Sequence, residues 1–385
     1  MSTTKSCDPG LTTKSCASGL TAAGVFVISG GGTGGHVTPA LALGEALRRQ
    51  GERTLFVGSE RGIEKRLVPD AGFELVTLDA RPVIGRRVLA RAAALLALAR
   101  ATLRARRLLR ERGARLVIAV GGYASVPAAL AAALSRIPIV LVNSDAVPGL
   151  ANRVLARFAT RVFVGWPGAA AAFGGGRRIE VSGVPLREAL RHAFAATARE
   201  EKHGDERLHL FAFGGSQGAR QINDALLAAL PALDPTRLAV VHQTGESDRE
   251  RVEAAWRAAG FDAVVTAFER DMPSRYRWAD LVVCRAGAIS VAELALAGRP
   301  ALLIPLAHVG GGEQFANARE LARAGAARVL DSRELSHEGF TRELVALLED
   351  PSRLREMGGR AAALARPDAA DAIATQCRAL VGAAA

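Results

Sequence analysis

The sequence predicts two α/β domains in tandem, each a parallel sheet with helices on both faces. Short apolar runs rich in β-branched residues alternate with segments rich in Ala, Leu and Arg, which is the pattern of successive βαβ units. The alternation weakens between residues 164 and 204 and then restarts. A chain of 385 residues is also too long for one ordinary core. These observations favour two doubly wound domains.

The composition indicates a globular protein with an anionic partner. Hydrophobic residues make up 49% and charged residues 23%, which is far from the disordered class. The net charge of +12 suggests nucleic acid, nucleotide phosphate or acidic lipid as that partner. The four cysteines form no CxxC pair and show no zinc-like spacing, so no metal site is predicted. No stretch approaches the ~20 apolar residues of a membrane span.

Predicted strands and helices alternate through the first half of the chain. Each predicted strand is short and ends in small or polar residues, as strands of a buried parallel sheet do. The strands are expected at residues 25–29, 53–59, 116–122 and 138–143, and the helices at 39–50, 86–112 and 126–135.

The second half repeats this organisation. Strands are expected at residues 208–216, 238–245, 262–268, 280–287 and 300–306. The first units of the two halves match, because VFVISGGGTGGH and LHLFAFGGSQGAR each read as strand, glycine loop and helix. Since ligands of open α/β sheets bind beyond the carboxyl ends of the strands, we expect a functional cleft where the two sheets face each other.

Four segments follow from this pattern. Residues 1–23 contain the repeat TTKSCDPGL and TTKSCASGL and are expected to form a disordered extension. Residues 24–187 form the first predicted domain and residues 188–366 the second. Residues 367–385 are expected to form a C-terminal helix or tail, which could pack back on the first domain.

The first glycine loop leaves a dinucleotide-binding function open. Gly30 to Gly35 satisfy GxGxxG, and Glu60 directly follows the second predicted strand, where a ribose-binding acid would stand. An NAD-dependent oxidoreductase is therefore an alternative. Against it, similar loops recur at residues 214–218 and 285–293, whereas one dinucleotide normally needs only one such loop.

A nucleotide sugar fits the three loops better. Backbone amides at a helix N-terminus bind diphosphate oxygens, and the predicted helix that opens at Ala288 to Ser290 offers such amides. Glu293, one turn further on, could accept hydrogen bonds from both ribose hydroxyls. Glu293 could equally be a solvated residue of the helix face, and a non-catalytic nucleotide-sugar-binding protein also remains open.

Several motifs, taken together and in order, resemble the MurG family of peptidoglycan glycosyltransferases. They are GGGTGGHVTPALALGEAL (30–47), GGYASVPAALAA (121–132), FGGSQGARQIN (213–223), HQTGE (242–246) and CRAGAISVAELALAGRPALLIPL (284–306). The resemblance runs from about Val25 to Arg366. It implies the GT-B architecture, two Rossmann-like domains facing a cleft. It also implies an inverting N-acetylglucosaminyltransferase without metal or cofactor.

The same resemblance implies both substrates and their binding residues. The donor would be UDP-N-acetylglucosamine, and the acceptor would be undecaprenyl-linked muramyl-pentapeptide. His36 would be the catalytic base beside the acceptor hydroxyl, although it could instead be a structural residue of the loop. The donor site would comprise Thr33, Gly34, Gly35, Asp145, Arg187, Ser216, Gln217, Glu269, Ala288, Ile289, Ser290, Val291, Glu293 and Gln314.

Two stretches depart from the family pattern. VNSD (142–145) stands where the family has HEQN, and HVGGGEQ (308–314) is unusually rich in glycine. Both affect sugar and acceptor recognition and leave the nucleotide-binding motifs intact. A UDP-sugar-dependent transferase with another lipid acceptor is therefore the alternative within the same fold.

The segment from Arg81 to Arg112 is expected to bind an anionic membrane surface. It holds ten arginines against one acid, around the wholly apolar stretch Ala92 to Ala99. That stretch is too short to cross a bilayer but suits a helix lying on one. An ordinary helix covering the sheet is the alternative. Nucleic acid is not expected, because the segment lacks aromatic residues for stacking. A peripheral location at the cytoplasmic face of the inner membrane follows from the resemblance.

Overall fold

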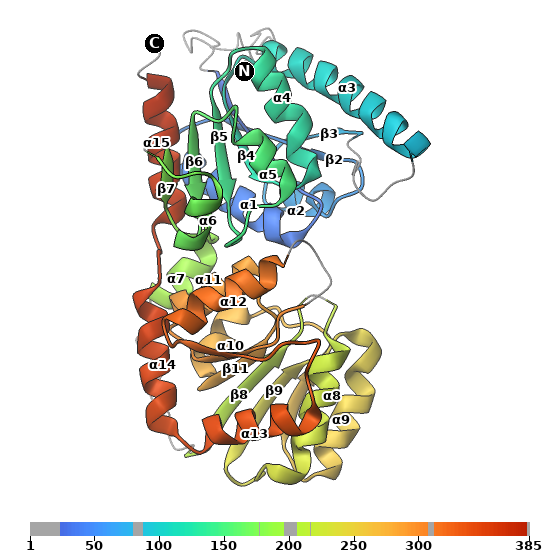
Figure 1. Cartoon of the computed structure of the whole chain (residues 1–385), viewed down its shortest axis with the longest axis vertical. Coiled ribbons are helices and arrows are strands. Elements are labelled where there is room, and N and C mark those ends of the chain that lie inside the picture. The colour runs from blue at the N-terminus through green and yellow to red at the C-terminus, as the bar shows by residue number, and fades with distance from the viewer. Residues whose placement is uncertain are drawn as a thin grey trace, which may run out of the picture.

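The computed structural model describes residues 24–79, 88–176, 178–195, 206–215, 217–306 and 312–382. Two parallel sheets form two domains stacked along the long axis of the molecule (Figure 1). The predicted fold class, two Rossmann-like doubly wound domains, is confirmed. The expected N-terminal extension and residues 81–87 of the basic segment lie outside the described residues.

The first sheet has the strand order β3-β2-β1-β4-β5-β6-β7, and every neighbouring pair is parallel. Its central strands are buried along almost their whole length, because helices cover both faces. The strands are β1 (Val25–Gly30), β2 (Thr54–Ser59), β3 (Leu75–Leu78), β4 (Ala114–Gly121), β5 (Ile139–Asn143), β6 (Arg161–Val164) and β7 (Ile179–Val181).

Helices pack on both faces of the first sheet. The connecting helices are α1 (Gly34–Arg49), α2 (Glu64–Asp70), α3 (Val88–Glu111), α4 (Val126–Leu134), α5 (Leu150–Leu155) and α6 (Pro167–Ala172). One face is covered by α1 together with α15 (Ala369–Gly382), the last helix of the chain, and the other by α3 and α4. The C-terminal helix therefore belongs to the core of the first domain (Figure 1).

The second sheet repeats the topology of the first, with the order β10-β9-β8-β11-β12-β13. Its strands are β8 (Leu208–Phe213), β9 (Leu238–Gln243), β10 (Ala263–Thr266), β11 (Leu281–Cys284), β12 (Ala301–Leu303) and β13 (Ala327–Val329). Its helices are α8 (Arg220–Ala229), α9 (Arg249–Ala258), α10 (Met272–Trp278), α11 (Ala288–Ala297), α12 (Glu313–Arg323), α13 (His337–Leu348) and α14 (Pro351–Ala363).

The chain crosses between the domains twice, and the two crossings pack against each other. The first crossing leads through α7 (Glu188–Ala195), and the second joins α14 to α15. Gly183, with φ of 89°, lies on the first crossing. A Cβ atom at this glycine would lie 2.3 Å from the Cβ of Arg366 on the second crossing. Only glycine allows this close approach.

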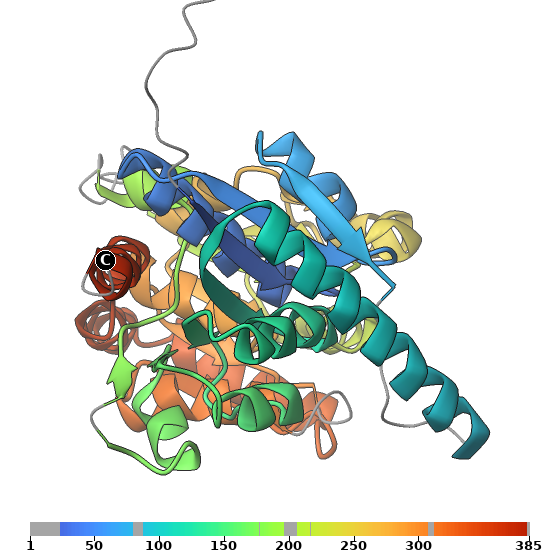
Figure 2. The same cartoon turned by 90° about the horizontal axis from the view of Figure 1, so that it is seen from above.

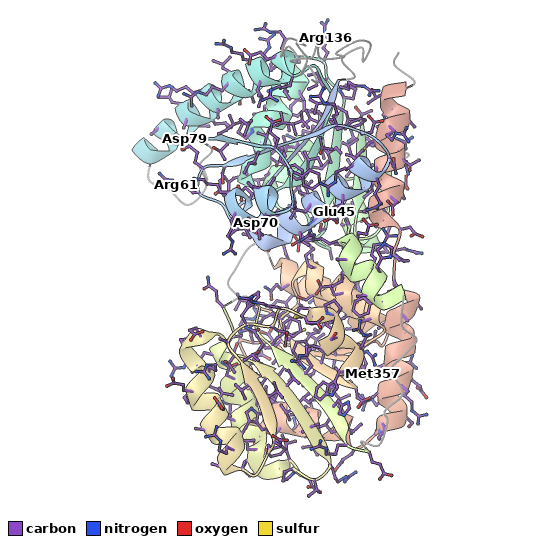
Figure 3. All side chains as sticks on the ribbon, turned by 180° about the vertical axis from the view of Figure 1, so that it is seen from behind. Glu45, Arg61, Asp70, Asp79, Arg136 and Met357 are labelled. Carbon is purple, nitrogen blue, oxygen red and sulfur yellow. The ribbon has the colours of Figure 1, made fainter. Side chains whose placement is uncertain are left out.

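Ion pairs join α1 to the first crossing and to α15. Glu45 of α1 accepts hydrogen bonds from Arg187 Nε and Nη2 at 3.0 and 2.7 Å, and Figure 3 shows Glu45 on the side of α1 that faces this junction. Asp371 of α15 accepts from Arg49 Nη2 at 2.5 Å and from Arg191 Nη1 at 2.6 Å. Three segments far apart in the sequence are thus tied together.

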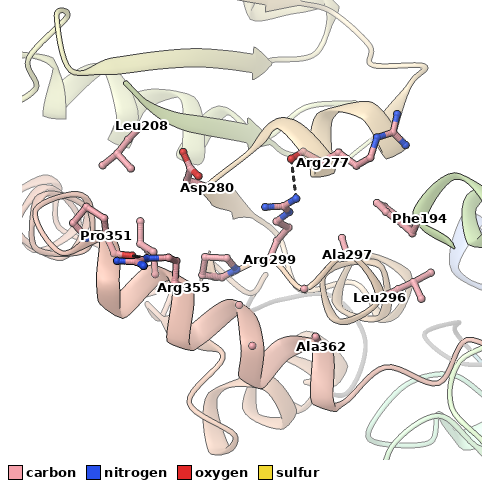
Figure 4. Close-up of a pocket in the computed structure, with 15 residues that line it drawn as sticks. Phe194, Leu208, Arg277, Asp280, Leu296, Ala297, Arg299, Pro351, Arg355 and Ala362 are labelled. Carbon is pink, nitrogen blue, oxygen red and sulfur yellow. Dashed lines mark hydrogen bonds between the residues drawn. The ribbon is translucent and has the colours of Figure 1, made fainter. Parts of the chain in front are cut away.

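A cavity of about 490 Å³ lies at the amino-terminal edge of the second sheet. Arg277, Arg299 and Arg355 line it, and the Arg299 guanidinium donates to the carbonyl of Arg277 at 2.8 Å (Figure 4). Leu208 and Asp280, which stand where β8 and β11 begin, form part of its wall. The cavity is therefore on the opposite edge of the sheet from the glycine loop that follows β8.

Candidate active site between the two domains

The glycine loops lie at the topological switch point of each sheet. In the first sheet β1 lies between β2 and β4, and in the second β8 lies between β9 and β11. The loops after β1 and β8 therefore open at the carboxyl edge, where ligands of doubly wound sheets bind. In Figure 1, α1 and α2 of the first domain face α11 and α12 of the second across the domain junction.

His36 lies in the first turn of α1, because the helix begins at Gly34 rather than near residue 39 as the sequence predicted. Thr33 Oγ1 lies 3.0 Å from His36 Nδ1. The imidazole packs on Gly121 and Gly122, where added Cβ atoms would come within 2.9 and 3.3 Å of ring atoms. Both glycines have positive φ, 105° and 75°, so no other residue type fits there without strain.

The environment of His36 keeps the imidazole neutral. Burial lowers the pKa of His36 below its ordinary value of 6.5, and nearby carboxylates offset only part of this shift. These carboxylates belong to Asp145, Glu313 and Glu64. A neutral imidazole can accept a proton, which is what a general base requires.

Glu64 of α2 holds the first glycine loop in place. Its Oε2 accepts from the Gly32 amide at 2.9 Å, and its Oε1 accepts from the amide and hydroxyl of Ser59 at 2.8 and 2.7 Å. Glu64 is only 1% exposed. Burial raises its pKa, but these hydrogen bonds outweigh burial and leave the pKa below its ordinary value. A charged carboxylate therefore lies directly beneath the loop.

Asn317 of α12 joins the two domains beside this site. Its Nδ2 donates to Asp145 Oδ1 at 2.9 Å and to the carbonyl of Ala286 at 3.2 Å. Its Oδ1 accepts from the Ala146 amide at 2.7 Å. Asn317 is fully buried, and its hydrogen bonds to Ala146 and Ala286 are buried as well. One side chain thus connects the loop after β5 with the segment that follows β11.

The second glycine loop packs tightly against the loop after β9. A Cβ atom at Gly218 would lie 1.9 Å from the carbonyl oxygen of Thr244, and one at Gly245 would lie 2.2 Å from that of Gln217. Both glycines have positive φ, 76° and 83°. Glycine is therefore required on both sides of the contact, which fixes the backbone at Gln217 and Gly218.

A buried hydrogen-bond chain supports this contact. Trp256 Nε1 donates to His242 Nδ1 at 3.2 Å, so the ring hydrogen of His242 is on Nε2, which lies 3.0 Å from Asn223 Oδ1. Asn223 Nδ2 in turn donates to the Thr244 carbonyl at 3.1 Å and to Asp248 at 2.8 Å. Burial lowers the pKa of His242 to about 3. This histidine is a neutral structural residue.

Glu293 lies on α11, whose first turn carries Ala288 to Ser290. Its Oε2 accepts a hydrogen bond from Tyr276 OH at 2.9 Å. Burial raises the pKa of Glu293 to about 7, and the hydrogen bond from Tyr276 offsets only part of that shift. The side chain nevertheless keeps partial exposure to solvent. It can therefore meet a ligand that supplies hydrogen-bond donors.

Other residues assigned from the sequence have partners of their own. Glu269 accepts from Arg275 Nε at 2.7 Å, and Gln314 Oε1 accepts from the Leu306 amide at 2.9 Å. Arg187 pairs with Glu45, as described above. Ser216 lies outside the described residues, and its neighbour Gln217 is exposed. Within the described ranges no group of three or more His, Cys, Asp or Glu side chains could hold a metal ion.

Comparisons with known proteins identify the family. The chain matches the glycosyltransferase family 28 N-terminal domain over residues 26–164 and the C-terminal domain of the same family over residues 209–373. The chain belongs to glycosyltransferase family 28. The two matches cover the two sheets separately, so both halves of the molecule carry the family's sequence pattern.

Relatives of this glycosyltransferase match nearly its whole length. A protein of Anaeromyxobacter sp. (strain Fw109-5) named UDP-N-acetylglucosamine--N-acetylmuramyl-(pentapeptide) pyrophosphoryl-undecaprenol N-acetylglucosamine transferase is 43% identical, over 92% of this chain and 93% of that protein. A protein of the same name from Syntrophus aciditrophicus (strain SB) is 41% identical, over 92% and 98%. The crystal structure of Acinetobacter baumannii MurG superposes with a TM-score of 0.78 at 31% identity, over 92% and 99%.

The site of this family 28 member contains residues that the sequence did not single out. Asn317 follows Gln314 by three positions on α12 and therefore shares its helix face. Arg285, within the RAGAIS motif, donates to the carbonyl of Ile304 at 2.9 Å and to Gln221 at 3.3 Å. Glu64 gave no signal, because its partners Gly32 and Ser59 belong to other segments.

Proposed function

We propose that this chain transfers N-acetylglucosamine from UDP-N-acetylglucosamine to undecaprenyl-linked muramyl-pentapeptide, with inversion at the anomeric carbon. The observation that carries the proposal is the convergence of two kinds of group at one junction. A neutral His36 comes from the first domain, and the helix N-terminus of α11 with Glu293 comes from the second. The relatives named above carry this activity in their names.

The donor is assigned to the second domain, at the side of that domain that faces the first. Backbone amides of the GGSQG loop and of the first turn of α11 hold the diphosphate, since such amides favour anions. Glu293 accepts hydrogen bonds from the ribose hydroxyls in place of the one from Tyr276. The backbone near Glu269 binds the uracil, and Gln314 reaches the sugar.

The acceptor hydroxyl is activated by His36 in this proposal. With the Nδ1 hydrogen directed to Thr33 Oγ1, Nε2 carries the lone pair and takes the hydroxyl proton. The hydroxyl oxygen bonds to the anomeric carbon while the bond from that carbon to the diphosphate oxygen breaks, and UDP leaves with the electron pair. Preorganised donors of the kind at α11 typically contribute ~3 to 4 kcal/mol each to stabilising such charge.

Glu64 argues against the oxidoreductase alternative. In a dinucleotide-binding domain the amides of the first glycine loop face the pyrophosphate. Here the Gly32 amide donates to the Glu64 carboxylate, which is buried and held in its charged form. A pyrophosphate at this position would lose that amide and meet a like charge. The first glycine loop therefore fits a role in positioning His36, the proposed general base, better than a role in binding a dinucleotide.

Helix α3 supports binding to a membrane surface. Ala101, Ala105 and Leu109 face the core, whereas Leu95, Leu96 and Leu103 are 55%, 60% and 64% exposed. Figure 2 shows the first turns of α3 projecting beyond the rest of the first domain. No helix in the described part of the chain is both long and apolar enough to cross a bilayer. We assign the protein a peripheral position at the cytoplasmic face of the inner membrane, with α3 against anionic lipid.

The transfer reaction itself is the test of the proposed function. Purified protein is incubated with labelled UDP-N-acetylglucosamine and the muramyl-pentapeptide lipid, and product is detected by the label that moves into the lipid phase. Calorimetry compares the binding of NAD with that of UDP-N-acetylglucosamine, and a parallel reaction offers another polyprenyl-linked acceptor. Label in the other acceptor alone would point to a different lipid substrate. Donor binding without any transfer would indicate a non-catalytic binding protein.

His36→Ala separates chemistry from donor binding. We expect the dissociation constant for UDP-N-acetylglucosamine, measured by calorimetry, to stay within about threefold, while kcat falls by ~10² to 10⁴ because general-base catalysis is lost. His337→Ala, at an exposed histidine of α13, is the matched control and should keep full activity. Unchanged turnover in His36→Ala would remove His36 from the mechanism.

A further inference from the structure

Asp145 and His36 share one rigid frame. Asn143 Nδ2 donates to the backbone carbonyl of Asp145 at 2.6 Å, and Asn152 Nδ2 donates to Asn143 Oδ1 at 2.8 Å. Asn152 and His36 both pack against Gly121. A Cβ atom at Gly121 would lie 3.2 Å from Asn152 Nδ2 and 2.9 Å from the His36 ring. The backbone that carries Asp145 is thus held in place beside the imidazole.

The Asp145 carboxylate also lies close enough to His36 for the charges of the two side chains to interact. Three carboxylates raise the pKa of His36, and they are, in decreasing order, those of Asp145, Glu313 and Glu64. The Glu64 carboxylate is already bound by Gly32 and Ser59. Burial raises the pKa of Asp145 above its ordinary value of 3.8, and the Asn317 hydrogen bond and His36 offset only part of that shift. The two side chains therefore respond to each other's charge.

We propose that Asp145 is a positioning residue of the transfer reaction, which stabilises the cation formed on His36 and links it to the donor domain through Asn317. The proposal rests on the function proposed above. It differs from the role that the resemblance implies for this position, which is contact with the donor sugar.

The chemistry explains why a carboxylate is useful here. When His36 Nε2 takes the acceptor proton, a positive charge forms on a ring largely removed from water, and desolvation opposes that charge. A fixed carboxylate nearby favours it, much as the aspartate of a catalytic triad favours the imidazolium it faces. No new bond forms on Asp145, and the proton stays on His36 until product leaves.

Asn317 gives this arrangement a dependence on domain position. It donates to Asp145 Oδ1 and to the carbonyl of Ala286, and Ala286 directly precedes the segment that opens α11. The carboxylate is therefore held where the donor domain places it. Movement of the second domain away from the first would break the hydrogen bonds to Asp145 and Ala146.

Asp145→Asn tests the charge, and its readout is the pH dependence of kcat. We expect kcat on its plateau to fall about 10- to 100-fold, with the donor dissociation constant within about threefold. Loss of the carboxylate lowers the pKa of His36, so the acidic limb of the kcat profile should move to lower pH. Asp145→Glu, which keeps the charge, should keep the limb near its wild-type position. Asp262→Asn, at an exposed carboxylate of the second domain, is the control.

Asn317→Ala tests the link. It keeps the charge of Asp145 and removes the hydrogen bonds between the domains, so kcat should fall several-fold without the shift of the acidic limb seen in Asp145→Asn. If Asp145→Asn weakens donor binding and leaves the acidic limb of the kcat profile at its wild-type pH, the proposal is overturned in favour of a contact with the donor sugar. Unchanged kcat would also overturn it. If Asp145→Asn does not fold, Asp145→Ala is assayed with and without formate, and activity restored by formate would indicate that the carboxylate is required.

Wild-type transfer decides separately whether the proposed function holds. If the wild-type protein transfers the sugar and Asp145→Asn matches it at every pH, only the role of Asp145 fails. If the wild-type protein does not transfer the sugar, the function fails first, and the role assigned to Asp145 falls with it.

Discussion

Glu293, which we propose accepts hydrogen bonds from the ribose, is a carboxylate whose charged form opposes stability. Its pKa is raised by burial to about 7 from an ordinary value of 4.5. The folded protein therefore binds this proton more tightly than the unfolded chain does. The free energy of unfolding consequently decreases as pH rises from about 4.5 to about 7, and the loss is complete above that range. A ribose diol would supply the hydrogen bonds that make the charged form favourable.

Glu293→Gln should stabilise the free protein and abolish donor binding. The amide oxygen can still accept from Tyr276, while the cost of burying a charge disappears. We expect the free energy of unfolding in urea to rise by on the order of 2 kcal/mol at pH 8 and by little at pH 4. Calorimetry should show the loss of UDP-N-acetylglucosamine binding.

Glu269→Gln is the matched control for this prediction. Burial raises the pKa of Glu269, but hydrogen bonds from Arg275 and Asp271 outweigh burial and lower it. Its charged form is therefore stabilising, and the same substitution should lower stability at pH 8. Equal effects of the two variants would contradict the assignment of an opposed charge at position 293.

Candidate functional residues could be predicted from the sequence only where they belong to a short motif. The glycine loops and Glu293 stand next to predicted strands and helices, which made them candidates. Asn317 could not be found in this way, because it contacts Asp145 and Ala146, which lie 172 and 171 positions away. The roles assigned to the donor-site residues stay predictions until the variants are measured.

Strands at the centres of the two sheets were predicted, whereas β3 and β7 at the edges of the first sheet were not. The apolar runs of the sheet centres became β1, β4 and β8, with boundaries that differ from the predicted ones by one to three residues. By contrast, β3 and β7 lie at the two edges of the first sheet and are mostly half-buried. An edge strand needs no continuous apolar run, since solvent reaches part of it, so the sequence gives no periodic signal there.

The start of α1 was missed for a different reason. Two glycines open the helix, and glycine is unfavourable in helices by about 1 kcal/mol relative to alanine. The amides of His36 and Val37 both donate to the Thr33 carbonyl nonetheless. Tertiary packing of the ring on Gly121 and Gly122 favours this turn, which local propensity cannot reveal.

Helix α3 yields a prediction about membrane binding. The double variant Leu95→Glu, Leu96→Glu places charges on two exposed positions, so the thermal midpoint should hardly change. Binding to vesicles that contain anionic lipid should weaken at least about tenfold, because two leucines no longer enter the interface. Cosedimentation measures this. Val264→Glu, at an exposed residue of the second domain, should bind like the wild type, and equal loss in both would argue against α3 as the contact.

The relative placement of the domains depends on charges at the junction as well as on Asn317. Asp371 accepts from a guanidinium on α1 and from one on α7. Burial raises the pKa of Asp371, but the hydrogen bonds from Arg191 and Arg49 outweigh it, and the net pKa lies below its ordinary value of 3.8. This carboxylate therefore stabilises the folded molecule above pH 4, and the stabilisation is lost as pH falls through the lowered pKa.

Asp371→Asn should lower the free energy of unfolding of the whole molecule. The groups are about one-third exposed, so we expect a loss of only about 1 kcal/mol at pH 7 in low salt. The loss should be smaller in 0.5 M salt because of screening, and it should vanish at pH values below the lowered pKa of Asp371. Asp368→Asn, whose side chain is 82% exposed, should cost less in chemical denaturation at the same salt. Equal losses would mean that Asp371 does not bridge the segments.

The C-terminal helix gives the molecule an unusual order of assembly. A ribosome completes the first sheet long before the second, yet Ala370, Ile373 and Cys377 of the final helix fill the core against that first sheet. The core of the half that is translated first is therefore completed last, only after α15 has left the exit tunnel. Until then the apolar face that α15 covers stays exposed to solvent. We expect chaperones and proteases to act on the nascent protein at this stage.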